Sequence, residues 1–178
     1  MYIVNSPPQL AFEIPPTAAP GIAMITITNS DGTVSLSSGQ VFPVAPGLFS
    51  ADASGQGIAA AGVLRVEADG SQSYAQVDAY DATQGHYVAI PVDLSSATEQ
   101  VFLVLYGTGI RGRSSLSGVT VTVGGVNTQV YYAGSQNLIP GLDQINVLLP
   151  HSLAGMGNVV VAATVDGQPA NHVTVTIK

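Results

Sequence analysis

Apolar and polar residues alternate along most of this chain, and no segment shows the three-to-four-residue spacing of an amphipathic helix. β-Branched residues are common in the alternating segments, which are separated by Gly, Pro, Asn and Asp turn signals. The turns recur at the spacing of a β-sandwich rather than that of alternating strands and helices. The sequence therefore predicts an all-β fold, an antiparallel β-sandwich.

Four hairpins are predicted from pairs of alternating segments joined by a short turn. An Asp-Gly or Gly-Gly pair stands at each turn, where the backbone needs positive φ. The expected strands are 24–28 with 33–37, 63–67 with 72–80, 119–123 with 126–133, and 158–165 with 172–177.

Two further segments, 86–94 and 100–109, are expected to be strands. Residues 100–109 are apolar on both faces, which favours a central strand with Tyr106 in the core. Pro91 removes a ladder hydrogen bond, so we expect it at an edge or a bulge. Only 94–100 and 151–157 have patterns compatible with a helical turn.

An internal repeat sets the expected domain organisation. A shift of 135 residues places 9–32 on 144–167 without a gap, matching Pro15 to Pro150 and Asp31 to Asp166. Residues 1–41 then correspond to the last strands of one sandwich, and residues 42–178 to a complete copy. A Pro-rich stretch, 41–49, is the expected joint.

A partial sandwich exposes an apolar face and unpaired strand edges. We therefore expect residues 1–41 to pack against other β-structure. The expected partners are proteins: other β-domains, or identical subunits that pair through edge strands.

Composition excludes several function classes. The 178 residues carry a net charge of −7 with only 8% charged residues, so no basic surface can neutralise nucleic-acid phosphates. Cysteine is absent, which excludes disulfides and thiolate chemistry. The first ten residues lack the features of a signal peptide, and the longest apolar runs are too short to span a membrane as a helix.

No residue set dictates a reaction, and we predict no catalytic, cofactor-binding or metal-binding residues and no cofactor. The three histidines, His86, His151 and His172, lack metal-ligand spacing. A loose acidic group around one hairpin leaves calcium as an alternative, and its members are Glu67, Asp69, Asp78 and Asp81.

Motifs for nucleophilic or nucleotide chemistry are equally weak. Serines are numerous, but no GxSxG motif is present, and the glutamates Glu13, Glu67 and Glu99 occupy expected strand and turn positions. Gly107 and Gly109 resemble part of a phosphate loop, but no helix pattern follows them, which favours a strand end with a close backbone approach. Lys178 is the sole lysine, which excludes a core Lys–Asn cross-link.

Tyrosines support one alternative function. Exposed tyrosines on a sheet can stack on sugar rings, and six stand in the predicted sandwich: Tyr74, Tyr80, Tyr87, Tyr106, Tyr131 and Tyr132. Against this, we expect Tyr106 in the core, and alternation points one of Tyr131 and Tyr132 inward.

Six segments occur in an order that resembles the Solibacter-type C-terminal domain of uncharacterised secreted bacterial proteins. They are 43–50, 55–71, 103–112, 121–134, 141–150 and 165–177. The resemblance implies an immunoglobulin-like (Ig-like), IPT/TIG-type sandwich attached to extracellular or cell-surface proteins, with no established activity and no site residues.

Together, these observations predict a non-catalytic structural, spacer or adhesion module of a bacterial surface or secreted protein, located outside the cell or on its surface. It is expected to assemble through β-strand pairing into oligomers or fibres. A carbohydrate-binding module, with polysaccharide as the partner, is the main alternative, and a hydrolase is the third.

Overall fold

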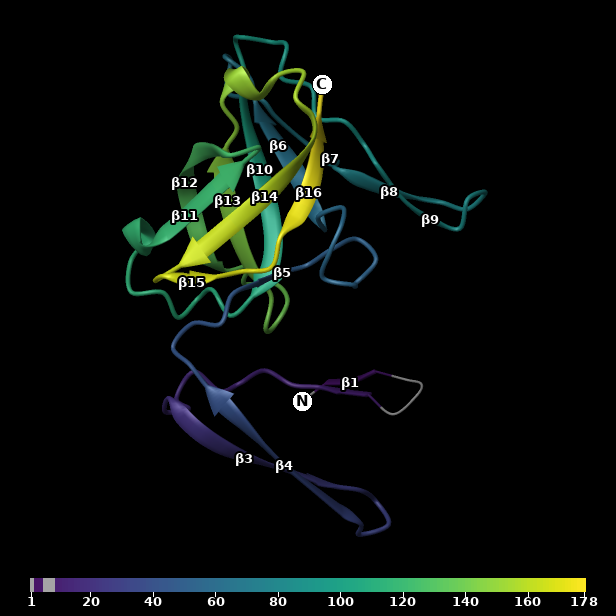
Figure 1. Ribbon diagram of the computed structural model, residues 1–178, viewed down its shortest axis with the longest axis vertical. Helices are drawn as coiled ribbons and strands as arrows, with labels where there is room; N and C mark the ends of the chain where they lie inside the picture. Colours follow the sequence, from purple (N-terminus) through teal and green to yellow (C-terminus); the bar gives the residue numbers. More distant parts are fainter. Residues whose placement is uncertain (1, 5–8) are drawn as a thin grey trace. The chain divides into compact units, whose positions relative to one another are not determined.

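The computed structural model describes residues 2–4 and 9–178 and shows an all-β protein (Figure 1). The chain forms two compact units, Met1–Pro43 and Val44–Lys178, which divide two residues beyond the expected boundary at 41/42. Two single 3₁₀ turns, η1 (Leu116–Gly118) and η2 (His151–Leu153), are the helical elements of the described part. None of its helices is long and apolar enough to cross a membrane.

The first unit contains two antiparallel strand pairs. One is β1 (Tyr2–Val4) with β2 (Gln9–Ala11), and the other is β3 (Gly21–Thr28) with β4 (Val34–Val41). The turn between β3 and β4 is held by Asp31, whose carboxylate accepts hydrogen bonds from the backbone and hydroxyl of Thr33. This confirms the first predicted hairpin.

The second unit is an antiparallel β-sandwich whose strands are linked by one continuous path of hydrogen-bonded neighbours. The path runs β15 (Gln168–Pro169), β14 (Gly157–Val165), β11 (Val119–Val123), β12 (Val126–Ser135), β13 (Asp143–Leu148), β10 (Gln100–Thr108), β6 (Ala61–Val66) and β7 (Gln72–Gln76). Off this path, β16 (Val173–Ile177) pairs with β14 and β5 (Gly47–Leu48) pairs with β10.

The path forms two layers because β12 pairs with a different partner in each half. Residues 126–128 pair with β11, and 129–135 pair with β13, with a β-bulge between Val130 and Tyr132. Figure 1 shows β11, β14 and β16 in one layer and β6, β10 and β13 in the other. The three remaining predicted hairpin pairings, β6–β7, β11–β12 and β14–β16, are present.

The core lies between the layers and is built from alternate residues of each strand. Leu103 and Leu105 of β10 are fully buried and pair with Val147 and Ile145 of β13, respectively. Val161 of the opposite layer belongs to the same apolar cluster. Because β10 pairs with both β6 and β13, it is the central strand that the sequence predicted.

The segment predicted as one strand, 72–80, is two strands in different sheets. β7 ends at Gln76, and β8 (Asp78–Asp81) pairs instead with β9 (His86–Ala89) in a hairpin that extends from the sandwich (Figure 1). Val77 is buried at the junction, where it bonds to Ala61 and Ile90. Alternation continues across Val77, so the pattern could not reveal the change of sheet.

One of the two expected helical turns is present, and Pro91 occupies a position that needs no ladder hydrogen bond. Residues 151–157 do contain the expected helical turn, η2, whereas 94–100 contain none. Pro91 lies just after β9 and outside every ladder, as its missing N–H requires. The chain then rejoins the sandwich at Val92, which forms a parallel bridge with Ile177.

Candidate functional site

The outer face of one layer carries five of the eight aromatic side chains of the second unit. Across β7, β6, β10, β13 and β12, the ladder places Tyr74, Leu64, Phe102, Leu148 and Gln129 in one row. The neighbouring rows contain Val104, Asn146 and Tyr132, and Tyr106 with Gln144. We call this surface, on the side of the layer away from the core, the aromatic face.

Tyr106 lies on the aromatic face and not in the core, so its predicted place is wrong. Leu103 and Leu105 occupy the core side of β10, and strand alternation therefore turns Tyr106 outward. Its hydroxyl lies 3.1 Å from that of Tyr74 on β7. Burial, together with this hydrogen bond, raises the pKa of the Tyr74 hydroxyl.

Glycine makes room for Tyr74. Gly62 lies on β6, the strand between those that carry Tyr74 and Tyr106. A side chain at Gly62 would collide with the phenol end of Tyr74. The ring consequently lies over the backbone of β6, and 49% of the residue stays exposed to solvent.

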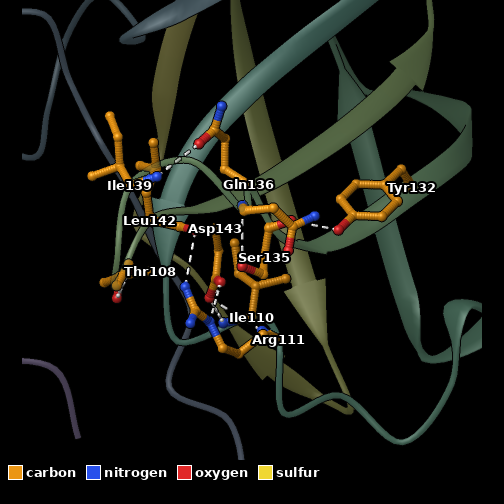
Figure 2. Close-up of polar contacts among 11 residues, drawn as sticks. Thr108, Ile110, Arg111, Tyr132, Ser135, Gln136, Ile139, Leu142 and Asp143 are labelled. Carbon is orange, nitrogen blue, oxygen red and sulfur yellow. Dashed lines mark hydrogen bonds and ion pairs between the residues drawn. The ribbon is translucent and has the colours of Figure 1, made fainter.

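The bulge in β12 turns two neighbouring tyrosines outward together. Tyr131 is the extra residue of the bulge, is 47% exposed and packs edge-on against Phe102 at 5.1 Å between ring centres. Tyr132 pairs with Asn146 on the same face, and its hydroxyl donates to the Ser135 carbonyl (Figure 2). The expectation that one of the two points inward is therefore wrong, because a bulge breaks the two-residue period.

Amide side chains complete the aromatic face. Gln76 and Gln129 are exposed, and Gln144 donates a 2.6 Å hydrogen bond to Asn146. All outward positions of these five strands are described, and none of them is charged.

The outer face of the opposite layer has a different composition. Its ladder aligns small polar residues, with Thr120 and Thr122 on β11 beside β14, and Thr174 and Thr176 on β16 at its other edge. Val160 is its one large exposed apolar residue among those described. Only one of the two outer faces is aromatic.

The β3–β4 pair of the first unit is the second candidate surface. Register places Ile22, Met24, Val34 and Leu36 on one face, and these residues are 57–82% exposed. Ala23, Ile25 and Ile27 lie on the other face and are partly buried. Within the described residues, β3 and β4 pair only with each other. We call this pair the ribbon.

The histidines lie on three separate segments. His86 begins β9, His151 contacts the Leu94 carbonyl at 3.0 Å, and His172 lines an open cavity of about 680 Å³ with Phe49 and Gln56. No carboxylate lines that cavity. Among the described residues, no three His, Asp or Glu side chains gather where they could hold a metal ion.

Two of the acidic residues considered for calcium binding accept hydrogen bonds within their own turns. Asp69 accepts from the Ser71 backbone and Asp81 from Thr83 and Gln84, and these hydrogen bonds lower the pKa of both carboxyls. Burial raises the pKa of Asp78. Glu67 is exposed at a turn, and Glu13 is exposed in the first unit.

Glu99 is the glutamate with a clear structural role. It is almost fully buried and accepts a 2.6 Å ion-pair hydrogen bond from Arg65. Arg65 also donates to the Asp93 carbonyl, which fixes the segment before β10.

Asp143 holds the loop that follows β10 (Figure 2). It is fully buried and accepts from the Ile110 and Arg111 backbone and from Arg111 Nε at 2.6 Å. Gly109 lies at φ +71° against the Ala45 backbone, with no room for a side chain. This glycine-rich stretch is therefore the expected close backbone approach at a strand end.

Comparison with known proteins gives no relative. No protein-family model, curated protein or solved structure matches the chain.

Sequence reasoning missed Phe102, Gln129 and Asn146 as parts of a shared surface. The available signal was the apolar outer face of β10, since an exposed layer normally carries polar residues outward. The bulge that turns Tyr131 outward had no recognisable sequence signal.

Proposed function

We propose that this protein is a non-catalytic structural or adhesive β-module that associates with other β-structure through the ribbon of its first unit. One observation carries the proposal. Ile22 and Met24 are 82% and 67% exposed, Leu36 is 67% exposed, and both edges of the strand pair lack neighbours in the described chain. Such a surface is typical of an interaction site.

The internal repeat indicates what the ribbon binds. Met24 of β3 aligns with Val159 of β14, which is 7% exposed because the opposite layer covers it. The ribbon therefore has the pattern of a sandwich strand without its facing sheet. We infer that its partner presents an apolar β-sheet face, as a second copy or another β-domain would.

A non-catalytic role agrees with the distribution of titratable groups. The histidines lie on separate segments, and Glu99 and Asp143 are engaged in ion pairs that hold loops. A location outside the cell or on its surface, in a bacterium, rests on the cysteine-free, charge-poor composition and on the resemblance to the Solibacter-type domain. The Ig-like assignment rests on that resemblance too.

Sedimentation of the full chain over a range of concentrations tests the association. We expect oligomers for the native sequence and monomers for Met24→Asp combined with Leu36→Asp, because charge on the ribbon face opposes burial. Val160→Asp is the matched control, since Val160 is 47% exposed on the outer face of β14, and it should oligomerise normally.

Amide hydrogen exchange completes the test. A native chain that stays monomeric, with the amides of β3 and β4 protected, would show that the ribbon is stable without a partner. That result would contradict the proposal.

A further inference from the structure

We propose that the aromatic face binds a neutral, extended polysaccharide by stacking sugar rings on Tyr74 and Tyr131. This goes beyond the structural role and uses a different surface from the ribbon. The ligand class follows from three properties of the face: its exposed rings, its amide groups and its lack of charge.

Both rings are held in place before any ligand arrives. Tyr74 lies over Gly62, with its hydroxyl at 3.1 Å from that of Tyr106. Tyr131 packs edge-on against Phe102, with the two planes at 88°. Each of the two tyrosines keeps about half of its surface in solvent. A fixed aromatic ring loses little conformational freedom when it binds, which favours stacking on the C–H face of a sugar.

The structure removes the two sequence-based objections to sugar binding. Tyr106 supports Tyr74 on the outer face, where the sequence had placed it in the core. The bulge brings Tyr131 and Tyr132 to the same side. Four of the six tyrosines of the second unit, Tyr74, Tyr106, Tyr131 and Tyr132, thus belong to one surface.

Polar groups at the rim match the hydroxyls of a neutral glycan. Gln76 and Gln129 are exposed, and an amide can donate to one hydroxyl and accept from the next. The lack of charge at the outward positions of these strands gives no attraction for an anionic chain.

The extent of the face suits several sugar units. Tyr74 stands on β7, four strand-to-strand steps from β12, which corresponds to about 19 Å at the usual strand spacing. The outer face of the opposite layer, with its threonines, provides no comparable rings.

Binding of the full chain to a fixed set of polysaccharides tests the proposal. The probes are cellulose, chitin, xylan and galactomannan as neutral glycans, and polygalacturonate as the anionic one. We expect the native chain to bind at least one neutral glycan and not polygalacturonate. Failure to bind any of the four neutral glycans, or binding to polygalacturonate alone, overturns the proposal.

Matched variants locate the site. Tyr74→Ala and Tyr131→Ala should each weaken binding at least tenfold. Tyr80→Ala is the control, because Tyr80 is 59% exposed on the projecting β8–β9 hairpin, away from the aromatic face, and it should bind as the native chain does. Equal losses in all three variants would exclude the aromatic face.

A fluorescent variant keeps the test decisive if the alanine variants fold poorly. The chain contains no tryptophan, so Tyr131→Trp and Tyr80→Trp each introduce a single reporter. Glycan should shift the emission of Tyr131→Trp alone, and the absence of that shift overturns the proposal. Sedimentation of the same proteins reports ribbon association separately, so failure of one proposal does not imply failure of the other.

Discussion

Strands β3 and β14 share an aligned sequence pattern but have opposite burial. In β14, Val159, Val161 and Ala163 lie in the core, whereas the aligned Met24, Thr26 and Thr28 of β3 are exposed. β14 has neighbours on both edges and a facing layer, and β3 pairs only with β4 in the described chain. Alternation therefore specifies which side chains share a face, but only a facing sheet makes one of those faces a core.

The turns that follow these two strands also differ, because only the turn after β14 bonds to a distant segment. Asp31 and Asp166 are aligned by the repeat, and Asp31 bonds only within its own turn, to Thr33. Asp166 instead accepts from the backbone and hydroxyl of Ser114, 52 residues away. In the second unit, a turn residue has thus acquired a tertiary role.

The largest effect should come from a charge at the aligned strand positions. Val159→Asp places a carboxylate in the core and should cost about 3–5 kcal/mol of unfolding free energy, because nothing there pairs with the charge. Met24→Asp should leave the stability of the second unit unchanged. Urea denaturation of both variants measures the difference, and equal losses would mean that the two strands have the same environment.

A similar loss is expected where the second unit buries an ion pair. Asp143→Ala leaves Arg111 and two backbone N–H groups without their acceptor and should cost about 3 kcal/mol. The stability of the second unit, followed by urea denaturation, provides the measurement. Asp143→Asn should recover part of the loss, because its amide oxygen can still accept from the backbone, and an unchanged midpoint for both variants would refute the role assigned to Asp143.

The aligned aspartates give an intermediate test. Asp166→Ala removes two hydrogen bonds between distant segments and should lower the stability of the second unit by about 1–2 kcal/mol. Asp31→Ala removes only local bonds in an exposed turn and should have little effect. Thermal denaturation of both variants compares them, and a larger loss for Asp31→Ala would reverse the comparison.

The smallest effect is expected from acid. Hydrogen bonds from Ser95, together with Lys178, lower the pKa of Asp93, so its carboxylate stabilises the folded state above the unfolded pKa of about 4 and the contribution is lost as pH falls below it. Asp52, Asp69 and Asp81 act in the same direction. Asp78 acts in the opposite one, because its raised pKa favours folding at low pH.

Acid should therefore lower the stability of the second unit slightly, since these carboxylates are exposed and solvent screens them. The urea midpoint at about pH 6 and about pH 3 measures this. Asp93→Asn should reduce the difference between the two midpoints. A midpoint that rises on acidification would show that Asp78 dominates.

Local signals predicted much of this fold. The four hairpins needed only alternation and an Asp-Gly or Gly-Gly turn, and each pairing is present. The central place of β10 followed from its two apolar faces.

Tertiary features limited the rest. Val77 continues the alternation of β7 while its backbone bonds direct the chain into the β8–β9 hairpin. The aromatic face likewise depends on pairing across five strands and on the bulge at Tyr131. Neither the partners of a strand nor a bulge is specified by the residues of that strand alone.

Parallel bridges join β16 to the segments at Ile58 and Val92, and such bridges bear on how a strand would respond to mechanical tension. The Thr174 carbonyl accepts from the Ala59 N–H, and the Thr174 N–H donates to the Gly57 carbonyl. Val92 bonds in the same way to both Thr176 and Lys178. A pull along β16 loads these bonds sideways and simultaneously, whereas a hairpin peeled from its end breaks them one after another. A strand anchored in shear is what the proposed structural role would require if the module had to transmit force.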